Sequence, residues 1–158
     1  MNIIYSNQPP LEQPTECVSI FLVGPTPRSS EVPSWRPLAI QYLEDLGFNG
    51  TVLIPEYDTK KAFSNYDNQV WWERKGLINC TKIIAWVPRN METMPALTTN
   101  IELGYWLAKQ PQKVFFGRPD GAPHTAYLDW LYQLETSRSP FNNLKTMLEE
   151  VLFKKENQ

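Results

Sequence analysis

The residues of this sequence that could take part in binding or catalysis follow four short apolar runs. They are chiefly glycine, arginine, carboxylates and amides. Grouped by run, they are Gly24, Pro25, Thr26 and Arg28; Glu56 and Tyr57; Arg89 and Asn90; and Arg118 and Asp120. Arginine side chains and glycine backbone amides are groups that bind anions. The segments that carry these residues therefore need to be placed in a fold before any chemistry is assigned.

The four apolar runs are short, rich in β-branched and aromatic residues, and closed by glycine or proline, which is typical of buried strands. The predicted strands are residues 18–23, 51–54, 82–87 and 113–116. Apolar residues at helical spacing occupy the segments between and after them. The predicted helices are residues 35–46, 68–78, 99–109, 124–136 and 140–155. Ser34 is placed to cap the first helix and Gly47 to end it.

This alternation of strands and helices predicts an α/β protein. The expected fold is a flavodoxin-like or Rossmann-like doubly wound parallel sheet of four to five strands, with helices on both faces. Residues 17–158 are expected to form a single domain. Residues 1–16 contain three prolines and no periodicity, and we interpret them as an irregular leader suited to contact a neighbouring subunit. In such sheets ligands bind beyond the carboxyl ends of the strands, which is where the polar residues gather.

Composition excludes several classes of protein. The chain has 158 residues, 42% of them apolar, and a formal net charge of −2, so nothing in it attracts a nucleic acid polymer. Its one histidine, His124, and its two separated cysteines argue against a Ser-His-Asp triad or a metal site, and we expect no metal and no cofactor. No apolar run approaches the ~20 residues of a membrane span, and the N-terminus lacks the pattern of a secretory signal. A cytoplasmic protein without a membrane partner is expected.

Three basic positions have two readings each. The loop Gly24–Ser30 could wrap an anion with backbone amides, but it lacks the further glycines and the lysine of a P-loop, and a simple tight turn is the alternative. Arg36, in a first helical turn, suits an anionic ligand or a carboxylate partner. Arg118 could meet a phosphate or be an exposed loop cation.

Glu102 also has two readings. Thr99-Asn100-Ile101-Glu102 has the pattern of a capping box, in which the glutamate bonds back to the amide of the cap residue. The other reading places the carboxylate in a site at the edge of the sheet. A helix N-terminus would keep such a carboxylate ionised, so the two readings conflict only in part.

Four segments together resemble the nucleoside 2-deoxyribosyltransferase family in their order and spacing. They are Ile20–Pro25, Ser34–Arg36, Trp72-Glu73 and Thr98–Gly104, and the resemblance spans roughly residues 18 to 120. It implies a flavodoxin-like sheet and cleavage of a nucleoside N-glycosidic bond. It also implies that Glu102 attacks the anomeric carbon of deoxyribose to form a covalent intermediate, from which a second base or water takes the sugar. A carboxylate suits the oxocarbenium-like transition state of this reaction.

The resemblance assigns further roles and exposes two departures. Glu73 is the candidate for the second acidic position, which donates a proton to the leaving base. The expected substrate-binding residues are Phe21, Gly24, Pro25, Arg28, Trp35, Arg36, Tyr57, Trp72, Thr99, Asn100 and Arg118. Phe21 stands where family members often have a tyrosine, and Ala96 stands where they often have an aspartate.

Two functions of different classes follow. The first is a deoxyribosyltransferase or the related N-glycosidase of nucleotide metabolism, which acts on a deoxynucleoside or its monophosphate. The second is a non-catalytic nucleotide-binding module that has kept the fold and the pocket, and Phe21 and Ala96 favour it. In both cases the expected partner is a small-molecule nucleoside or nucleotide, and the resemblance implies a homo-oligomer.

Overall fold

The computed structural model describes residues 1–57 and 66–153 of the chain. These residues fall into two compact units, each built from two segments. Unit 1 comprises Met1–Val23 and Asn49–Ile84, and unit 2 comprises Gly24–Phe48 and Ala85–Gln158. We describe each unit by itself, and the prediction of a single domain stays a prediction.

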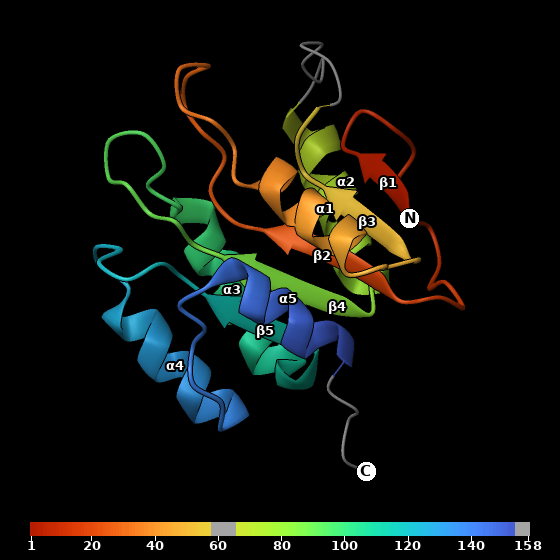
Figure 1. Cartoon of the computed structure of the whole chain (residues 1–158). Helices are drawn as coiled ribbons and strands as arrows, with labels where there is room; N and C mark the ends of the chain where they lie inside the picture. Colours follow the sequence, from red (N-terminus) through yellow and green to blue (C-terminus); the bar gives the residue numbers. More distant parts are fainter. Residues whose placement is uncertain (58–65, 154–158) are drawn as a thin grey trace. The chain divides into compact units, whose positions relative to one another are not determined.

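A five-stranded parallel sheet runs through the chain in the order β1-β3-β2-β4-β5 (Figure 1). The strands are β1 (Asn2–Tyr5), β2 (Ser19–Val23), β3 (Thr51–Ile54), β4 (Lys82–Trp86) and β5 (Val114–Gly117). The helices are α1 (Arg36–Asp45), α2 (Tyr66–Asn79), α3 (Leu97–Lys109), α4 (Ala126–Thr136) and α5 (Leu144–Phe153), with a 3₁₀ turn at Pro111–Lys113. The prediction of a doubly wound α/β fold is confirmed.

Unit 1 corrects the expected irregular leader. Residues 2–5 form β1, which pairs in parallel with β3 in the register Asn2↔Thr51 to Tyr5↔Ile54. Four residues beside a proline-rich stretch are too few to show a period, so the strand was missed. The chain after β1 also bonds within the unit. Its carbonyls accept from side chains of α2, with Trp72 Nε1 donating to Gln8 O at 3.0 Å and Asn79 Nδ2 to Leu11 O at 2.7 Å.

Unit 2 packs helices against one another and against β5. Helix α3 lies against α4, and α5 lies against both α1 and β5. Helix α1 begins at Arg36, whose backbone amide donates to Ser34 Oγ at 3.2 Å, and it ends before Gly47, which has a φ of +71°. The predicted start and stop of this helix are therefore close to the observed ones.

Four helix starts differ from the predicted ones by two residues or more. Helix α2 begins at Tyr66 rather than at residue 68. Helix α3 begins at Leu97 rather than at residue 99, and α4 begins at Ala126 rather than at 124. Helix α5 begins at Leu144, because Asn143 Oδ1 accepts from the backbone amide of Thr146 at 3.0 Å in the manner of a cap. The predicted end of this helix, residues 154–155, lies outside the described residues. None of the helices in the described ranges has the length and apolarity that crossing a bilayer requires.

Candidate functional site

In unit 2, four of the expected substrate-binding residues come together in the loop between β2 and α1. Arg36, 1% exposed, donates from Nη2 to Gly24 O at 2.7 Å and from Nη1 to Pro25 O at 3.4 Å and Thr26 Oγ1 at 3.2 Å. Trp35 Nε1 donates to the same Pro25 carbonyl at 3.2 Å, and the guanidinium of Arg36 lies 5.0 Å from the centre of the Trp35 ring. Arg36 therefore fixes the loop with these contacts, and Trp35 is a buried support for it.

Gly24 is required by close packing. A Cβ at this position would lie 2.3 Å from the backbone oxygen of Trp86 and 2.7 Å from Cζ2 of Trp35. Both distances are far below van der Waals contact, and a backbone oxygen cannot swing aside. Only glycine therefore lets the loop pass β4 at this distance.

The remaining basic residue of that loop, Arg28, has an exposed side chain. Its backbone amide donates to Thr93 O at 3.0 Å, which links the loop after β2 to the loop after β4. The second loop has order of its own, since Asn90 and Met94 pair through their backbones and Asn90 Oδ1 accepts from the amides of Glu92 and Thr93.

The capping-box reading of Glu102 is wrong. The cap residue of α3 is Ala96, and the amide of Asn100 donates to Ala96 O at 3.2 Å, so Thr99 is the third helical residue. Glu102 then lies in the second turn, beyond the amides that a cap can reach. Its side chain is half-buried, at the border between the buried face of α3 and the exposed one. From this position, the Glu102 carboxylate cannot act as the cap of α3.

Two other residues of the Thr-Thr-Asn segment have structural roles. Thr99 is 1% exposed and lies on the same buried face of α3 as Leu103 and Trp106. Asn100 is half-buried and its Oδ1 accepts a short hydrogen bond from Nη2 of Arg89.

Arg89 is one of the polar residues that follow a predicted strand, but it was not among the expected substrate-binding residues. It is 7% exposed, Nη1 donates to His124 O at 2.6 Å, Nη2 donates to Asn100, and the buried Nε has no hydrogen-bond partner. Burial lowers the pKa of this guanidinium. Its place directly after Pro88, at the carboxyl end of β4, was visible in the sequence, but its burial was not.

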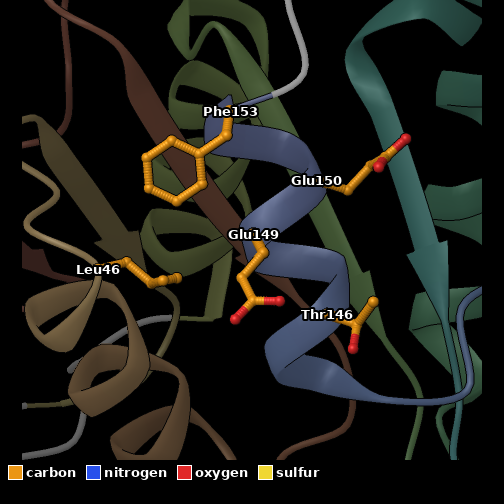
Figure 2. A pocket seen from close by; sticks show the side chains of 5 residues that line it. All are labelled: Leu46, Thr146, Glu149, Glu150 and Phe153. Atoms are coloured by element: carbon orange, nitrogen blue, oxygen red, sulfur yellow. The ribbon is translucent and has the colours of Figure 1, made fainter.

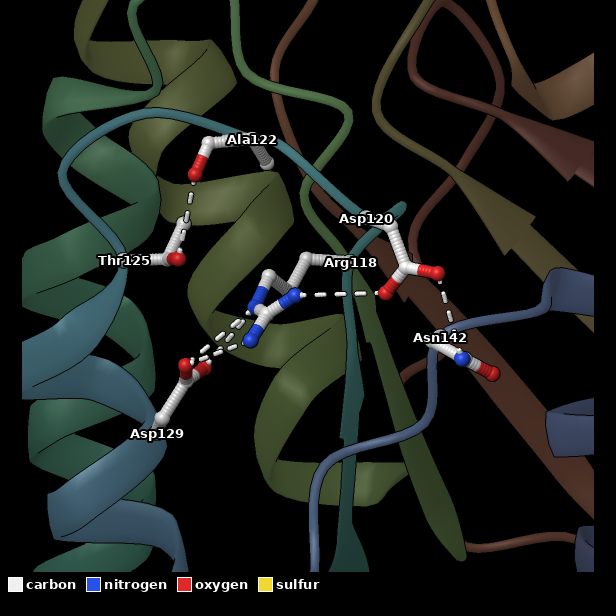
Figure 3. Close-up of polar contacts among 6 residues, drawn as sticks. All are labelled: Arg118, Asp120, Ala122, Thr125, Asp129 and Asn142. Atoms are coloured by element: carbon white, nitrogen blue, oxygen red, sulfur yellow. Dashed lines mark hydrogen bonds and ion pairs between the residues drawn. The ribbon is translucent and has the colours of Figure 1, made fainter.

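Arg118 is paired rather than available (Figure 3). Nε and Nη2 both bond the carboxylate of Asp129, the shortest contact being 2.8 Å, and Nη1 lies 3.9 Å from Asp120 Oδ1. The hydrogen bond with Asp129 raises the pKa of Arg118. Asp120 in turn accepts from Nδ2 of Asn142 at 3.4 Å. Arg118 was predicted either to bind a phosphate or to be an exposed loop cation. This geometry fits neither prediction, because the guanidinium is paired with protein carboxylates.

In unit 1, the two expected aromatic residues are core. Phe21 is 1% and Trp72 3% exposed, and their ring centres lie 5.8 Å apart. Gly76 on α2 makes room for Phe21, because a Cβ there would lie 2.7 Å from the Phe21 ring. The phenylalanine thus fills its place by packing alone.

The acidic candidate of unit 1 ends a short hydrogen-bonded chain. The Tyr57 hydroxyl donates to Gln69 Oε1 at 3.4 Å, and Gln69 Nε2 donates to Glu73 Oε1 at 3.0 Å. Gln69 and Glu73 are one turn apart on α2, so their side chains lie on one helix face. The half-buried Glu73 is therefore oriented by its neighbours, as a group that acts at a fixed place needs to be.

One shallow pocket of unit 2 contains none of the expected site residues (Figure 2). It lies between the end of α1 and one side of α5, with Glu149 and Phe153 turned towards it. Its lining is Leu46, Thr146, Glu149, Glu150 and Phe153. Its two carboxylates, Glu149 and Glu150, make it a poor site for an anionic nucleotide.

These features define an α/β protein whose polar residues follow the strands, with one group of candidates in each unit. A family comparison gives the class a name. The description "nucleoside 2-deoxyribosyltransferase like" matches residues 17–120, about two thirds of the chain, and the protein belongs to this family. A search of curated proteins found no match.

Proposed function

We propose that the protein cleaves the N-glycosidic bond of a deoxynucleoside or deoxynucleoside monophosphate through a covalent bond between the sugar and Glu102. The observation that carries the proposal is the position of Glu102 in the second turn of α3. This carboxylate lies inside the part of the chain that the family description matches. A half-buried carboxylate is partly shielded from water, which suits a nucleophile.

The reaction proceeds in two balanced steps. A Glu102 carboxylate oxygen attacks C1′ of the sugar while the bond from C1′ to the base breaks, and its electron pair goes to the base nitrogen. We assign to Glu73 the proton that this base then accepts, on the support of the Tyr57–Gln69–Glu73 hydrogen bonds that orient it. In the second step a nitrogen of another base, or a water oxygen, attacks C1′ and releases Glu102, and the proton that this nucleophile loses returns to the Glu73 carboxylate.

The test is base release. The purified protein is incubated with the four deoxynucleosides and their 5′-monophosphates, with and without a second free base, and the products are separated by chromatography. Glu102→Gln keeps the shape and removes the nucleophile, so we expect a loss of about 10³-fold or more in turnover. Glu135→Gln, an exposed carboxylate on α4, is the matched control and is expected to keep full activity.

Each outcome selects one function. Base exchange supports a transferase, and release without an acceptor supports a hydrolase. Mass spectrometry of wild-type protein quenched during turnover is expected to show the added mass of the sugar on the peptide that contains Glu102. Ligand binding without base release supports the non-catalytic module, and full activity in Glu102→Gln rejects the nucleophile assignment.

The assembly of the protein is part of the proposal. Helices α3 and α4 of unit 2 pack together and both expose large apolar side chains. They are Leu97, Ile101 and Tyr105 on α3 and Tyr127, Trp130 and Leu134 on α4, exposed by 41–74%. Apolar faces of this kind are typical of subunit contacts, and we propose that a second copy of the chain covers this one.

Light scattering after size-exclusion chromatography tests the assembly. Trp130→Glu is expected to shift the protein to a monomer. Leu38→Glu, on the exposed side of α1, is the matched control and is expected to leave the mass unchanged. An unchanged mass in both variants, or a monomeric wild type, contradicts the proposed contact.

A further inference from the structure

Arg89 is a buried cation whose charge no described residue of unit 2 neutralises. Three buried side-chain atoms of the described residues have no hydrogen-bond partner, and only Nε of Arg89 belongs to a charged group. The acceptors that Arg89 does reach, His124 O and Asn100 Oδ1, are neutral. Within the described part of the chain no carboxylate pairs with it. Buried charges are ordinarily paired, since an unpaired one is costly.

The neighbouring helix terminus makes the arrangement still less favourable. Asn100 lies in the first turns of α3, so the guanidinium sits close to the N-terminal end of that helix. No side chain caps this end, and its first amides carry partial positive charge. A cation and a helix N-terminus repel each other, and one bound anion would relieve both. The exposed Thr98 leaves part of the first turn open to solvent.

We propose that Arg89 and the first-turn amides of α3 form a subsite for a phosphomonoester, which makes a deoxynucleoside 5′-monophosphate the preferred substrate. This inference rests on the proposed function, because it places the phosphate on the helix that carries Glu102. Glu102 follows Leu97 by five residues, about 7.5 Å along the helix axis. A deoxyribose with its 5′-phosphate spans a gap of that order. Asn100 and the His124 carbonyl act as positioning groups that hold the guanidinium in place.

The other arginines of unit 2 fit this role less well. Arg36 is bonded to carbonyls of its own loop, and Arg118 is bonded to Asp129. Arg138 donates from Nη2 to Pro111 O and Val114 O. Arg89 is the buried one with a donor still unused.

Binding to the wild-type protein is the first measurement, and it needs no turnover. Inorganic phosphate and deoxyribose 5-phosphate are titrated by calorimetry and by thermal unfolding in a buffer free of other multivalent anions. Both are expected to bind and to raise the melting temperature, because they bind only the folded state. Deoxyribose, which lacks the phosphate, is the negative probe. Failure of both anions to bind the wild type overturns the subsite.

Variants then separate the subsite from the reaction. Arg89→Met is expected to abolish phosphate binding and to raise KM for the monophosphates about 10- to 100-fold more than KM for the unphosphorylated nucleosides. Arg89→Lys keeps a charge without the planar fork and is expected to lie between. Lys145→Met removes one positive charge from an exposed position on α5 and is expected to behave as wild type.

The outcomes keep the two proposals apart. Equal efficiency with nucleosides and monophosphates, and an equal loss for both in Arg89→Met, rejects the subsite and leaves the proposed function standing. Phosphate binding that depends on Arg89 without any base release supports the subsite and rejects the catalytic function. Should Arg89→Met fail to fold, the wild-type titrations and the Arg89→Lys kinetics decide the question.

Discussion

The loop after β2 and the loop after β4 both lie in unit 2, and each holds a buried arginine, yet they are built in opposite ways. Arg36, which follows the first loop, donates hydrogen bonds to two carbonyls and a hydroxyl of that loop. Gly24 lets the loop pass close to the Trp86 backbone oxygen, because it has no side chain. Arg89 of the second loop leaves Nε unbonded, and the loop ends at Ala96, which has a φ of +59°. Left-handed backbone is unfavourable for alanine.

In the proposed subsite Arg89 binds a ligand, whereas the contacts of Arg36 give it a structural role. In the first loop, the carbonyls of Gly24 and Pro25 and the hydroxyl of Thr26 all accept hydrogen bonds from Arg36. The second loop keeps an unmet donor, an uncapped helix and a strained residue next to one another in the chain. Strain and unsatisfied polar groups persist where something other than stability selects them. The following substitutions test whether the two loops differ in this way.

The largest effect is expected for Gly24→Ala. The new methyl group would lie 2.3 Å from the Trp86 carbonyl oxygen, and relieving that overlap requires a backbone shift. We expect the free energy of unfolding to fall by about 3 kcal/mol or more, measured by urea denaturation followed by tryptophan fluorescence.

The control is another glycine of unit 2. Nothing lies within 4 Å of a Cβ built on Gly104, which is in the middle of α3. Gly104→Ala is expected to stabilise the protein by about 1 kcal/mol, since alanine is the better helix former. Equal stability of Gly24→Ala and the wild type would show that the first loop is not locked.

The two arginines provide the direct comparison. Arg36→Met leaves the buried Gly24 carbonyl without its donor and removes a ring contact with Trp35, and we expect a loss of about 2–3 kcal/mol in the free energy of unfolding. Arg89→Met also loses two hydrogen bonds, but it removes an uncompensated buried charge, so a loss of about 1 kcal/mol or less is expected.

These two unfolding free energies are measured in phosphate-free buffer, and then again with phosphate. Phosphate is expected to widen the gap between wild type and Arg89→Met and to leave the gap between wild type and Arg36→Met as it was. Similar losses for the two variants without phosphate would mean that Arg89 is structural in the same sense as Arg36.

Much of the architecture was predictable, because short apolar runs closed by glycine or proline identify buried strands. Four of the five strands were found this way, whereas β1 has four residues and only half-buried side chains, so no pattern distinguished it from a loop. The start of α3 was missed for a different reason. Thr99 is a good cap residue by type, but the helix begins two residues earlier at Leu97, and its cap residue is Ala96, whose backbone conformation no propensity predicts.

The candidate site was predictable as a set of segments and less so as a set of roles. Gly24, Pro25, Trp35 and Arg36 do converge, as their shared loop suggested. Residue type could not show that Arg36 and Arg118 are fully engaged with protein groups while Arg89 keeps one unbonded donor. That difference depends on which partners the fold brings near. Burial and pairing are properties of the tertiary structure, so only the structure shows that Arg89 is the arginine with an unbonded buried donor.

The smallest effect is expected for Ala96→Gly, and its sign is informative. Glycine adopts the left-handed region without the roughly 1–2 kcal/mol that alanine incurs there, and this gain exceeds its own entropic cost of about 0.5–1 kcal/mol. We therefore expect a gain of up to about 1 kcal/mol in unfolding free energy. Ala108→Gly, an exposed site in the same helix, is expected to lose about 1 kcal/mol. Opposite signs for the same substitution show that the backbone of the second loop is strained at Ala96. A loss of stability in both variants would show that it is not, and the difference between the two loops would then rest on the unbonded Nε of Arg89 alone.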